Sequence, residues 1–486
     1  MGVLSIFEFF VNNILTKPEF FVGILVFIGY LLLKKPLYQA FSGFIKATVG
    51  YMILNVGAGG LVTTFRPILA GLNDRFGLNA AVIDPYFGLN AVNSALESIG
   101  LTTSWTMIAL LIGFTLNIVL VLFRKYTKIR TLFITGHIMV QQATTATWII
   151  FYAFPQYRNT TGAVMIGLFV GTYWAVATNL TVGATQRLTD GAGFVIGHQQ
   201  MFAIWATDKI APKIGDASKK LDDLKLPEWL SIFHDNIVAT GTLMIIFFGT
   251  ILGILGEDYM RVADAKNFGA SLNFVTYIVS KSLYFSVYLA ILMTGVRMFV
   301  SELTESFQGI SNRILPGVMP AVDCAAAYGF GSPNAVLFGF IFGAIGQFIA
   351  IAGLLIFKSP ILIITGFVPV FFDNATIAIF AEKRGGVKAA MILPFVSGIL
   401  QVLLGAVAVA LFKLQGFGGW HGNIDQSTLW VGQGFILNNF GLIGYFLCIV
   451  GMLVIPIIQY RKVNNHEHYF NNEVDIPDDE VVEVNY

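Results

Sequence analysis

The sequence predicts an all-α, polytopic membrane protein with about eleven transmembrane helices, and this fold class follows from its composition and hydrophobic patterning. Of the 486 residues, 56% are hydrophobic and only 12% are charged. The mean hydropathy is +0.74, which is far too apolar for a soluble protein. The apolar runs are long and do not alternate with polar residues, so a β-barrel is disfavoured. The net charge of +1 argues against nucleic acid as a partner.

Eleven apolar stretches approach the roughly twenty residues that a helix needs to cross a bilayer. The first stretch is followed by Lys34 and Lys35 and not by a small-residue cleavage site, so we expect no cleavable signal. The stretches cover residues 19–33, 44–62, 105–123, 131–154, 163–183, 237–255, 274–295, 335–357, 360–380, 387–412 and 434–458.

Basic residues beside these stretches predict the orientation of the chain in the membrane. They close the first stretch, fill the short loop 124–130 and follow the last stretch, and lysine-rich loops remain on the cytoplasmic side. The N-terminus is then expected outside and the C-terminus inside. A polar insert over residues 208–228 carries five lysines and is expected on the same inner side. The acidic tail over residues 461–486 is expected to be solvated.

A weak internal repeat relates the two halves of the chain. Residues 364–370 echo residues 134–140 at an offset of 230, and residues 295–310 align with residues 57–72 at an offset of 238. A half that holds an odd number of spans must be inverted in the membrane, and such repeats place the substrate near the midplane. We therefore expect an inverted repeat with halves 1–228 and 229–460, within which core and dimerisation domains are interleaved.

Two stretches, 57–90 and 297–323, are neither clean spans nor water-soluble loops. Pro67 and other helix breakers interrupt the first stretch, and the second has an apolar stripe at helical spacing. Both are predicted to be amphipathic helices that lie along the interface and lead into re-entrant hairpins. At the offset of 238, Tyr86 falls within one residue of Asp323, so the two hairpins would bring these side chains to equivalent places.

Two polar side chains occur deep in the apolar run 131–154. His137 and Gln141 are four residues apart, so they share one face of a helix. In hydrocarbon they must face a protein partner or a polar cavity, and an interhelical hydrogen bond is the ordinary alternative. The second copy of the repeat has Phe367 and Phe371 in their places. Because only the first copy has polar side chains at these positions, they are better explained by a substrate site than by helix packing.

Further candidates are His198 and Gln199, which follow a glycine-rich turn, and Asp323, which lies in an apolar segment. His198 and Gln199 fit either a polar helix start or, together with His137 and Gln141, a hydrogen-bonding cage. No cysteine or carboxylate accompanies the histidines at ligand spacing, so a zinc site is not expected. The carboxylate of Asp323 indicates function in such an apolar segment, although capping of the next helix explains it equally well, and one residue could do both.

These candidates favour solute binding over catalysis. No catalytic triad, phosphate-binding loop or paired carboxylates occur among them, so an intramembrane enzyme is not expected. For Asp373, which lies in the second copy of the repeat, helix capping is favoured. A cage of neutral donors and acceptors with one carboxylate suits a small polyhydroxylated solute, because histidine and glutamine donate to carbonyl or enolate oxygens and aspartate accepts from hydroxyl groups.

Several of these motifs together resemble one known family, the ascorbate-specific permease (IIC component) of the bacterial phosphoenolpyruvate-dependent phosphotransferase system. The similarity covers nearly the whole chain except the acidic tail. It is carried by Thr-Gly-His-Ile-Met-x-Gln-Gln at 135–142, Gly-Phe-x-Ile-Gly-His-Gln-Gln at 193–200, Leu-Lys-Leu-Pro-x-Trp-Leu-x-Ile-Phe-His-Asp-Asn-Ile-Val at 224–238, Gly-Val-Arg-Met-Phe-Val at 295–300 and Asp-Cys-Ala-Ala at 323–326.

The resemblance implies a homodimeric inner-membrane protein that takes up L-ascorbate and couples its uptake to phosphorylation, which gives L-ascorbate 6-phosphate inside. It implies that the phosphoryl donor is a phosphocysteine on a cytosolic IIB protein, which a IIA protein charges. This chain would then carry no phosphorylated residue of its own and need no cofactor or metal. The basic segments 124–130 and 209–225 are the candidate docking sites for IIB, although the positive-inside distribution of charge alone would also place lysines there.

The resemblance also implies which residues contact ascorbate, and Asp323 is in addition our candidate for a base that orients a hydroxyl group. Pro85 departs from the family pattern, which has threonine there, so it offers only backbone contact. An ion-coupled secondary transporter of a small polyhydroxylated anion is the alternative function. The implied contacts are Pro85, Tyr86, His137, Ile138, Met139, Val140, Gln141, His198, Gln199 and Asp323.

Overall fold

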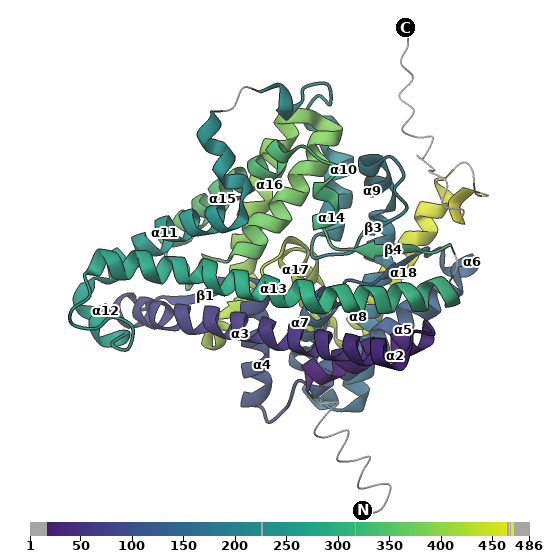
Figure 1. Ribbon diagram of the computed structural model, residues 1–486, viewed down its shortest axis with the longest axis horizontal. Coiled ribbons are helices and arrows are strands. Elements are labelled where there is room, and N and C mark those ends of the chain that lie inside the picture. The colour runs from purple at the N-terminus through teal and green to yellow at the C-terminus, as the bar shows by residue number, and fades with distance from the viewer. Residues whose placement is uncertain (1–16, 225–226, 316, 464–465, 467, 471–486) are drawn as a thin grey trace, which may run out of the picture.

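A computed structural model describes residues 17–224, 227–315, 317–463, 466 and 468–470 (Figure 1). The described chain is mostly helical, as predicted, and its elements follow the apolar stretches. Its first half contains α2 (Pro18–Leu32), α3 (Leu37–Phe76), α4 (Pro85–Ser98), α5 (Ser104–Leu122), α6 (Arg124–Thr127), α7 (Gly136–Ala153), α8 (Thr160–Leu180), α9 (Val182–Thr189) and α10 (Met201–Ile214).

The second half continues with another set of long helices, several of them joined by short helical turns. Its helices are α11 (Asn236–Leu255), α12 (Glu257–Ala263), α13 (Phe274–Ile314), α14 (Ala325–Tyr328), α15 (Pro333–Ile356), α16 (Asn374–Leu411), α17 (Ile424–Ser427) and α18 (Leu429–Arg461). The short turns along the whole chain are η2 (Pro155–Tyr157), η3 (Leu221–Asp223), η4 (Glu228–His234), η5 (Pro369–Asp373), η6 (Gln415–Phe417) and η7 (His468–Phe470).

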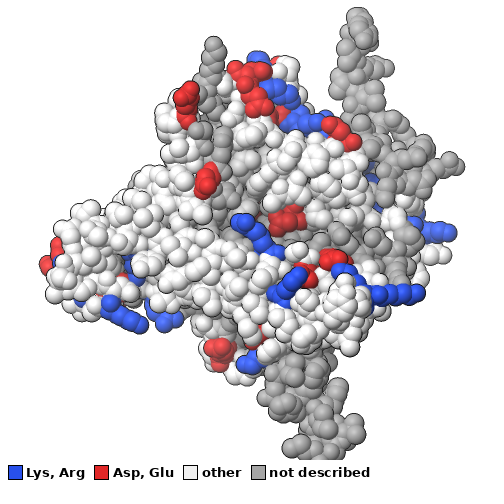
Figure 2. Space-filling model, in the orientation of Figure 1, with Lys and Arg blue, Asp and Glu red and all other residues white. Residues whose placement is uncertain are grey.

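Within the described ranges, eight helices are long and apolar enough to cross a membrane. Figure 2 shows one face that is largely free of charged side chains, with Lys, Arg, Asp and Glu gathered in small clusters, one of them near the upper end of α16. Charged groups are costly in hydrocarbon, so this distribution suits a multi-pass membrane protein.

Six short strands were not predicted, and the all-α description needs this correction. They form two parallel sheets of three strands each, in the orders β5–β1–β6 and β2–β4–β3. Each sheet takes its middle strand from one half of the chain and both outer strands from the other half. Pairing satisfies backbone groups that would otherwise be unpartnered in a membrane interior. The strands are β1 (Asn79–Ile83), β2 (Thr131–Phe133), β3 (Val195–Ile196), β4 (Met319–Val322), β5 (Ile361–Thr365) and β6 (Gly419–Trp420).

The two predicted interfacial helices are not separate elements. Each is the second part of one long helix, because α3 runs unbroken over 40 residues and α13 over 41. Pro67 lies inside α3 without ending it, and the helix stops only at Gly77, whose φ of 61° is left-handed. An internal proline costs about 3 kcal/mol in an isolated helix. We infer that packing of α3 along α2 and α13 offsets this cost.

Glycines permit α3 and α13 to approach closely. A Cβ atom on Gly295 would lie 2.4 Å from the backbone nitrogen of Leu54 and 2.5 Å from the carbonyl oxygen of Gly50. Small residues at such crossings give membrane helices their packing contacts. Gly50 and Gly295 therefore allow the two helix backbones to meet at this crossing.

Replacing Gly295 with valine should therefore destabilise the protein by at least about 1–3 kcal/mol, the usual cost of overpacking. The added atoms would meet backbone, which cannot move aside. Thermal unfolding of the purified protein in detergent measures the effect. Gly253→Ala is the matched control, because a Cβ atom there meets nothing within 4 Å, and its unfolding temperature should not fall.

Two of the long helices change direction at a glycine. Gly386 in α16 has φ 59° and ψ −158°, and Gly441 in α18 has φ 54° and ψ −137°. These values are strained for any residue with a side chain. The bend at Gly386 separates the predicted stretches 360–380 and 387–412.

The start of the C-terminal tail is not free in solvent, which corrects the prediction of a solvated tail. Tyr469 in η7 is only 1% exposed. Its hydroxyl donates to the carbonyl oxygen of Lys128 at 2.8 Å, and Arg130 donates to its own carbonyl oxygen at 2.6 Å. The tail is thereby held on the basic loop before β2. Residues 471–486, which carry most of the acidic side chains, lie outside the described residues.

The polar insert 208–228 is partly helical, because α10 continues to Ile214. Asp208 is buried within it and pairs with Arg187 and Arg384. The burial reflects these partners, because a buried carboxylate requires a charged or hydrogen-bonded neighbour. Lys225, one of the five lysines of the insert, lies outside the described residues.

Candidate functional site

The sheet β2–β4–β3 brings three predicted site residues together. His137 follows β2 at the start of α7, His198 follows β3 by two residues, and Asp323 comes directly after β4. Parallel strands end at the same sheet edge, so these side chains meet. His137 Nε2 lies 3.5 Å from Asp323 Oδ2, and His198 Nε2 lies 3.9 Å from the same oxygen.

The two histidines are buried, whereas the carboxylate is partly open. The side chains of His137 and His198 are each 6% exposed, and that of Asp323 is 34% exposed. The imidazole rings are 6.0 Å apart between centroids, and Phe299 of α13 lies edge-on to His137 at 6.3 Å. The site is therefore closed by aromatic side chains behind the histidines and accessible from the side of Asp323.

Asp323 uses its two carboxylate oxygens in different ways. Its Oδ1 accepts from the backbone N–H of Ala325 at 2.9 Å and caps the short helix α14. Its Oδ2 faces the two histidines instead. Capping fixes the orientation of the carboxylate, so the second oxygen is held at the site.

A hydrogen-bond network determines the tautomer of neutral His198. Gln200 Nε2 donates to Thr376 Oγ1 at 2.9 Å and to the carbonyl oxygen of Phe372 at 3.4 Å. Because a carbonyl oxygen only accepts, Gln200 Oε1 must face His198 Nδ1, at 2.8 Å. The neutral ring therefore carries its proton on Nδ1. Its Nε2 is an acceptor that faces the acceptor oxygen of Asp323, and a donor is required between or beside them.

A second network determines the polarity of the glutamines. The indole N–H of Trp174, which can only donate, bonds Gln142 Oε1 at 2.8 Å. Gln142 Nε2 then donates to Gln199 Oε1 at 2.8 Å, and Gln199 Nε2 donates to Gln141 Oε1 at 2.7 Å. The amide nitrogen of Gln141 is thus the donor end of this relay. We name Trp174, Gln142, Gln199 and Gln141 the glutamine relay.

Sequence reasoning missed the residues that orient the site, namely Gln142, Trp174, Gln200 and Thr376. A signal was present, because each histidine motif contains two adjacent glutamines, 141–142 and 199–200. In each pair one glutamine had been singled out and its neighbour had not. Trp174 and Thr376 come from α8 and α16, and no sequence pattern connects them with the histidines.

The remaining predicted contacts lie around this centre. Tyr86 is buried at the start of α4, which packs against α7, and its side chain interacts with Gln141. The backbone N–H of Tyr86 already donates to Asp84 at 3.0 Å. Pro85 is the first residue of α4, where its missing N–H is tolerated. Ile138, Met139 and Val140 are buried in the first turns of α7.

The structural counterpart of Asp323 is Asp84 and not Tyr86, which corrects the alignment by offset. Asp84 directly follows the middle strand β1 of the other sheet, as Asp323 follows β4, and it caps α4. Its second oxygen accepts from the backbone N–H of Val368 at 3.2 Å. The neighbouring Phe367 occupies the place of His137 and stacks on Phe371 at 5.0 Å. This second location is thus filled by protein groups.

The argument from spacing against a metal site does not hold in three dimensions. The donor atoms of His137, His198 and Asp323 lie within 4.8 Å of one another. Two histidines and one carboxylate are ligands for divalent metal ions. That argument considered only residues close to each histidine in the sequence. The fold brings in the carboxylate of Asp323 from a segment more than 120 residues away. The same set also suits the recognition of hydroxyl groups.

Two other buried carboxylates are structural. Asp373 does not cap α16, as had been favoured, but accepts from the backbone N–H of Ile424 at the start of α17 and from Asn423 and Gln401. Asp425 accepts from Tyr173 and from two backbone N–H groups of α10. Their oxygens are occupied by protein donors.

A polytopic helical protein with one set of polar side chains converging in its interior has the architecture of a solute permease. The chain belongs to the family of PTS system sugar-specific permease components, whose sequence model matches residues 13–458. It is similar to the ascorbate-specific PTS system EIIC component of Mycoplasma pneumoniae (strain ATCC 29342 / M129 / Subtype 1), with 34% identity over 442 residues. The alignment covers 83% of this chain and 66% of that relative, so the chain spans just under two thirds of the relative's length.

Proposed function

We propose that this protein takes up L-ascorbate across the bacterial inner membrane, and that a partner IIB protein phosphorylates the substrate to L-ascorbate 6-phosphate. The ascorbate specificity of the Mycoplasma pneumoniae relative supports this substrate. The observation that carries the proposal is the fixed polarity of the site. It presents the Gln141 amide as a donor, and His198 Nε2 and Asp323 Oδ2 as acceptors.

This polarity matches the two ends of ascorbate. The ring is an anion whose charge is spread over enolate and carbonyl oxygens, and it requires donors such as the amide of Gln141. The side chain carries hydroxyl groups, which donate. His198 Nε2 and Asp323 Oδ2 both accept hydrogen bonds, and among the described residues they face each other without a donor between them. A substrate hydroxyl group would supply the missing donor. As a hypothesis, Asp323 also takes this proton when the hydroxyl attacks the phosphoryl group.

The proposed substrate contacts are those predicted from the sequence, with their roles now separated. The side chains of His198 and Asp323 form the acceptor side of the site, with His137 beside them. Gln141, oriented by Gln199, forms the donor side. The contacts that remain proposals in the same site are Pro85, Tyr86, Ile138, Met139 and Val140.

An inverted repeat of eleven spans is part of this proposal. Eleven results when α2 and α7 are added to the eight long apolar helices and α16 is divided at Gly386. Corresponding strands begin 240, 230 and 224 residues apart, for β1 and β4, β2 and β5, and β3 and β6. The exchange of middle strands between the halves supports the repeat. A rigid-body shift of a core domain against a dimerising domain would then carry the site across the membrane.

The proposed orientation places the N-terminus outside and the C-terminus in the cytoplasm. IIB, charged by IIA, would dock on the inner side, where the loop 124–130 and the start of the polar insert lie. Arg130 and Lys128 in that loop contact Tyr469 and Tyr460. These partners and the homodimeric state are proposals from the family resemblance.

Uptake of labelled ascorbate into vesicles tests the proposal. With phosphoenolpyruvate and the soluble partners present, label should accumulate as L-ascorbate 6-phosphate, and without them accumulation should cease. An ion-coupled secondary transporter would give the opposite pattern. Accumulation of unmodified ascorbate that collapses with the proton or sodium gradient and ignores phosphoenolpyruvate would replace the proposal with that alternative.

His137→Ala and His198→Ala should each weaken ascorbate binding by about 1–3 kcal/mol, the cost of leaving a buried polar partner unmatched. Isothermal titration calorimetry with the purified protein measures the loss as a roughly 5- to 150-fold rise in Kd. His466→Ala is the matched control, because His466 is exposed and contacts the carbonyl oxygen of Tyr460. Wild-type affinity in both site variants would remove the histidines from the site.

A further inference from the structure

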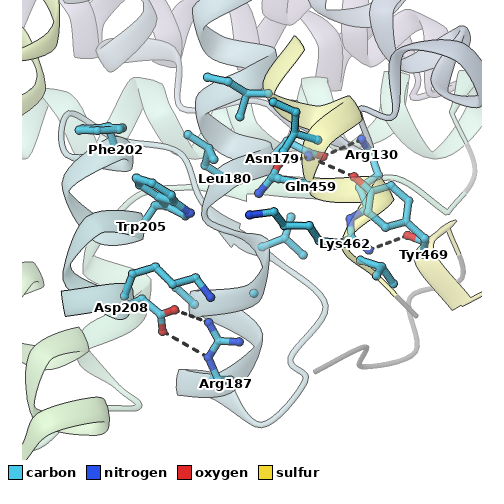
Figure 3. Close-up of a pocket in the computed structure, with 17 residues that line it drawn as sticks. Arg130, Asn179, Leu180, Arg187, Phe202, Trp205, Asp208, Gln459, Lys462 and Tyr469 are labelled. Carbon is cyan, nitrogen blue, oxygen red and sulfur yellow. Dashed lines mark hydrogen bonds and ion pairs between the residues drawn. The ribbon is translucent and has the colours of Figure 1, made fainter. Parts of the chain in front are cut away.

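A cavity lies away from the histidines, between the ends of α8 and α18 and the starts of α9 and α10 (Figure 3). Its volume is about 340 Å³. Arg130 and Tyr469 close it on one side, and Trp205 and Asp208 of α10 line the other. We name it the α10–α18 cavity.

Four cationic side chains line the α10–α18 cavity, and Asp208 is the one carboxylate among its described lining residues. That carboxylate is already paired with Arg187 and with Arg384. The lining therefore keeps a net positive charge that an anionic group would neutralise. The cationic residues are Arg130, Arg187, Lys209 and Lys462.

The rest of the wall is apolar and continues onto the outer face of α18. Phe202, Trp205 and Ile455 belong to the wall, as does Ile458. From Ile458 an exposed apolar stripe runs back along one helix face. Its members are Val454, Val450 and Leu447, and the four side chains are between 41% and 61% exposed. An exposed stripe of this kind on a membrane helix is a surface for hydrocarbon.

We propose that the α10–α18 cavity binds an anionic phospholipid, with its phosphate among the cationic side chains and an acyl chain along the stripe of α18. Arginine and lysine donate charge-assisted hydrogen bonds to phosphate oxygens. Basic cavities between membrane helices are recognised sites for anionic headgroups. Trp205 and Tyr469 are amphipathic side chains of the kind that lie at headgroup depth. This site is independent of the proposed transport activity.

Native mass spectrometry of the delipidated full chain tests the site with three probes: phosphatidylglycerol, phosphatidylcholine with the same acyl chains, and inorganic phosphate. Phosphatidylglycerol should bind to the wild type. The double variant Lys209→Gln/Lys462→Gln should bind it about 25-fold more weakly, which corresponds to about 2 kcal/mol at 1.4 kcal/mol per tenfold change. The control Lys266→Gln/Lys388→Gln removes two lysines that do not line the cavity and should bind normally.

A second variant tests the acyl chain separately from the charge. Ile458→Gln retains the four cationic side chains of the cavity and introduces a polar group into the stripe. It should therefore weaken phosphatidylglycerol binding, and its thermal stability in detergent should remain close to wild type. Equal binding of the two lipids, or an equal loss in the control pair, would overturn the proposal. Inorganic phosphate that competes with phosphatidylglycerol at equal concentration would reassign the site to a free anion.

Discussion

Asp323→Asn should reduce ascorbate uptake about a hundredfold or more while weakening substrate binding only about tenfold. Asparagine still accepts from the N–H of Ala325, so the cap of α14 remains. Its amide group, however, would donate to His198 Nε2, which Asp323 now faces. This acceptor would then be occupied and could not receive a substrate hydroxyl. Loss of a charged hydrogen-bond partner costs about 1.5–3 kcal/mol, and loss of a general base about 10²–10⁴-fold in rate.

The measurement combines uptake by reconstituted vesicles, supplied with the phosphoryl-transfer partners, with calorimetric binding. Asp235→Asn is the matched control, because Asp235 caps α11 by accepting from two backbone N–H groups and is not among the residues of the site. Both variants replace a carboxylate at the start of a helix with an amide. A difference in uptake between them would therefore report the role of Asp323 at the site. Uptake at the wild-type rate by Asp323→Asn would exclude the proposed base.

Gln142→Leu should destabilise the fold by about 3–6 kcal/mol, because it leaves several buried polar groups without partners at about 1–3 kcal/mol each. The indole N–H of Trp174 would lose its acceptor, and Gln199 Oε1 and the carbonyl oxygen of His198 would lose their donor. The glutamine relay would also lose its fixed polarity. Protein that still folds should therefore bind ascorbate at least about tenfold more weakly.

Chemical unfolding in detergent measures the stability, and calorimetry measures the binding. Gln433→Leu is the control, because Gln433 is also a buried helical glutamine, and its side-chain partner among the described residues is Met452 Sδ, at 3.5 Å. Removing an amide with so weak a partner should cost little. Similar unfolding midpoints for the two variants would show that the glutamine relay does not stabilise the protein.

Most of the long helices were predictable because they are almost continuous apolar runs, and the bilayer sets their length. The stretch 105–123 and helix α5 differ by one residue at each end. The strands were not predictable, since segments of two to five residues inside apolar runs carry no pattern of their own. The unbroken course of α3 through Pro67 depends on its contacts with α2 and α13, which lie far away in the sequence.

The chemistry of the candidate site was predictable from residue type and surroundings, because His137, His198 and Asp323 are costly in an apolar segment. Their meeting point was not. It depends on three short strands whose parallel pairing joins segments around residues 132, 195 and 320. For the same reason we assigned Asp84 and not Tyr86 as the counterpart of Asp323. Each of these two carboxylates directly follows the middle strand of its sheet, and the sequence offset alone did not show this.

The sequence by itself determined that the chain carries long apolar helices of membrane-spanning length, and it singled out the polar side chains that we propose as the substrate site. Hydrophobic length and the cost of burying charge are local properties, and they can be read from residue order. Only the tertiary structure decided which side chains face one another and which way each amide and imidazole points. Those directions depend on fixed donors and acceptors such as Trp174 and the carbonyl oxygen of Phe372, which folding brings from distant helices.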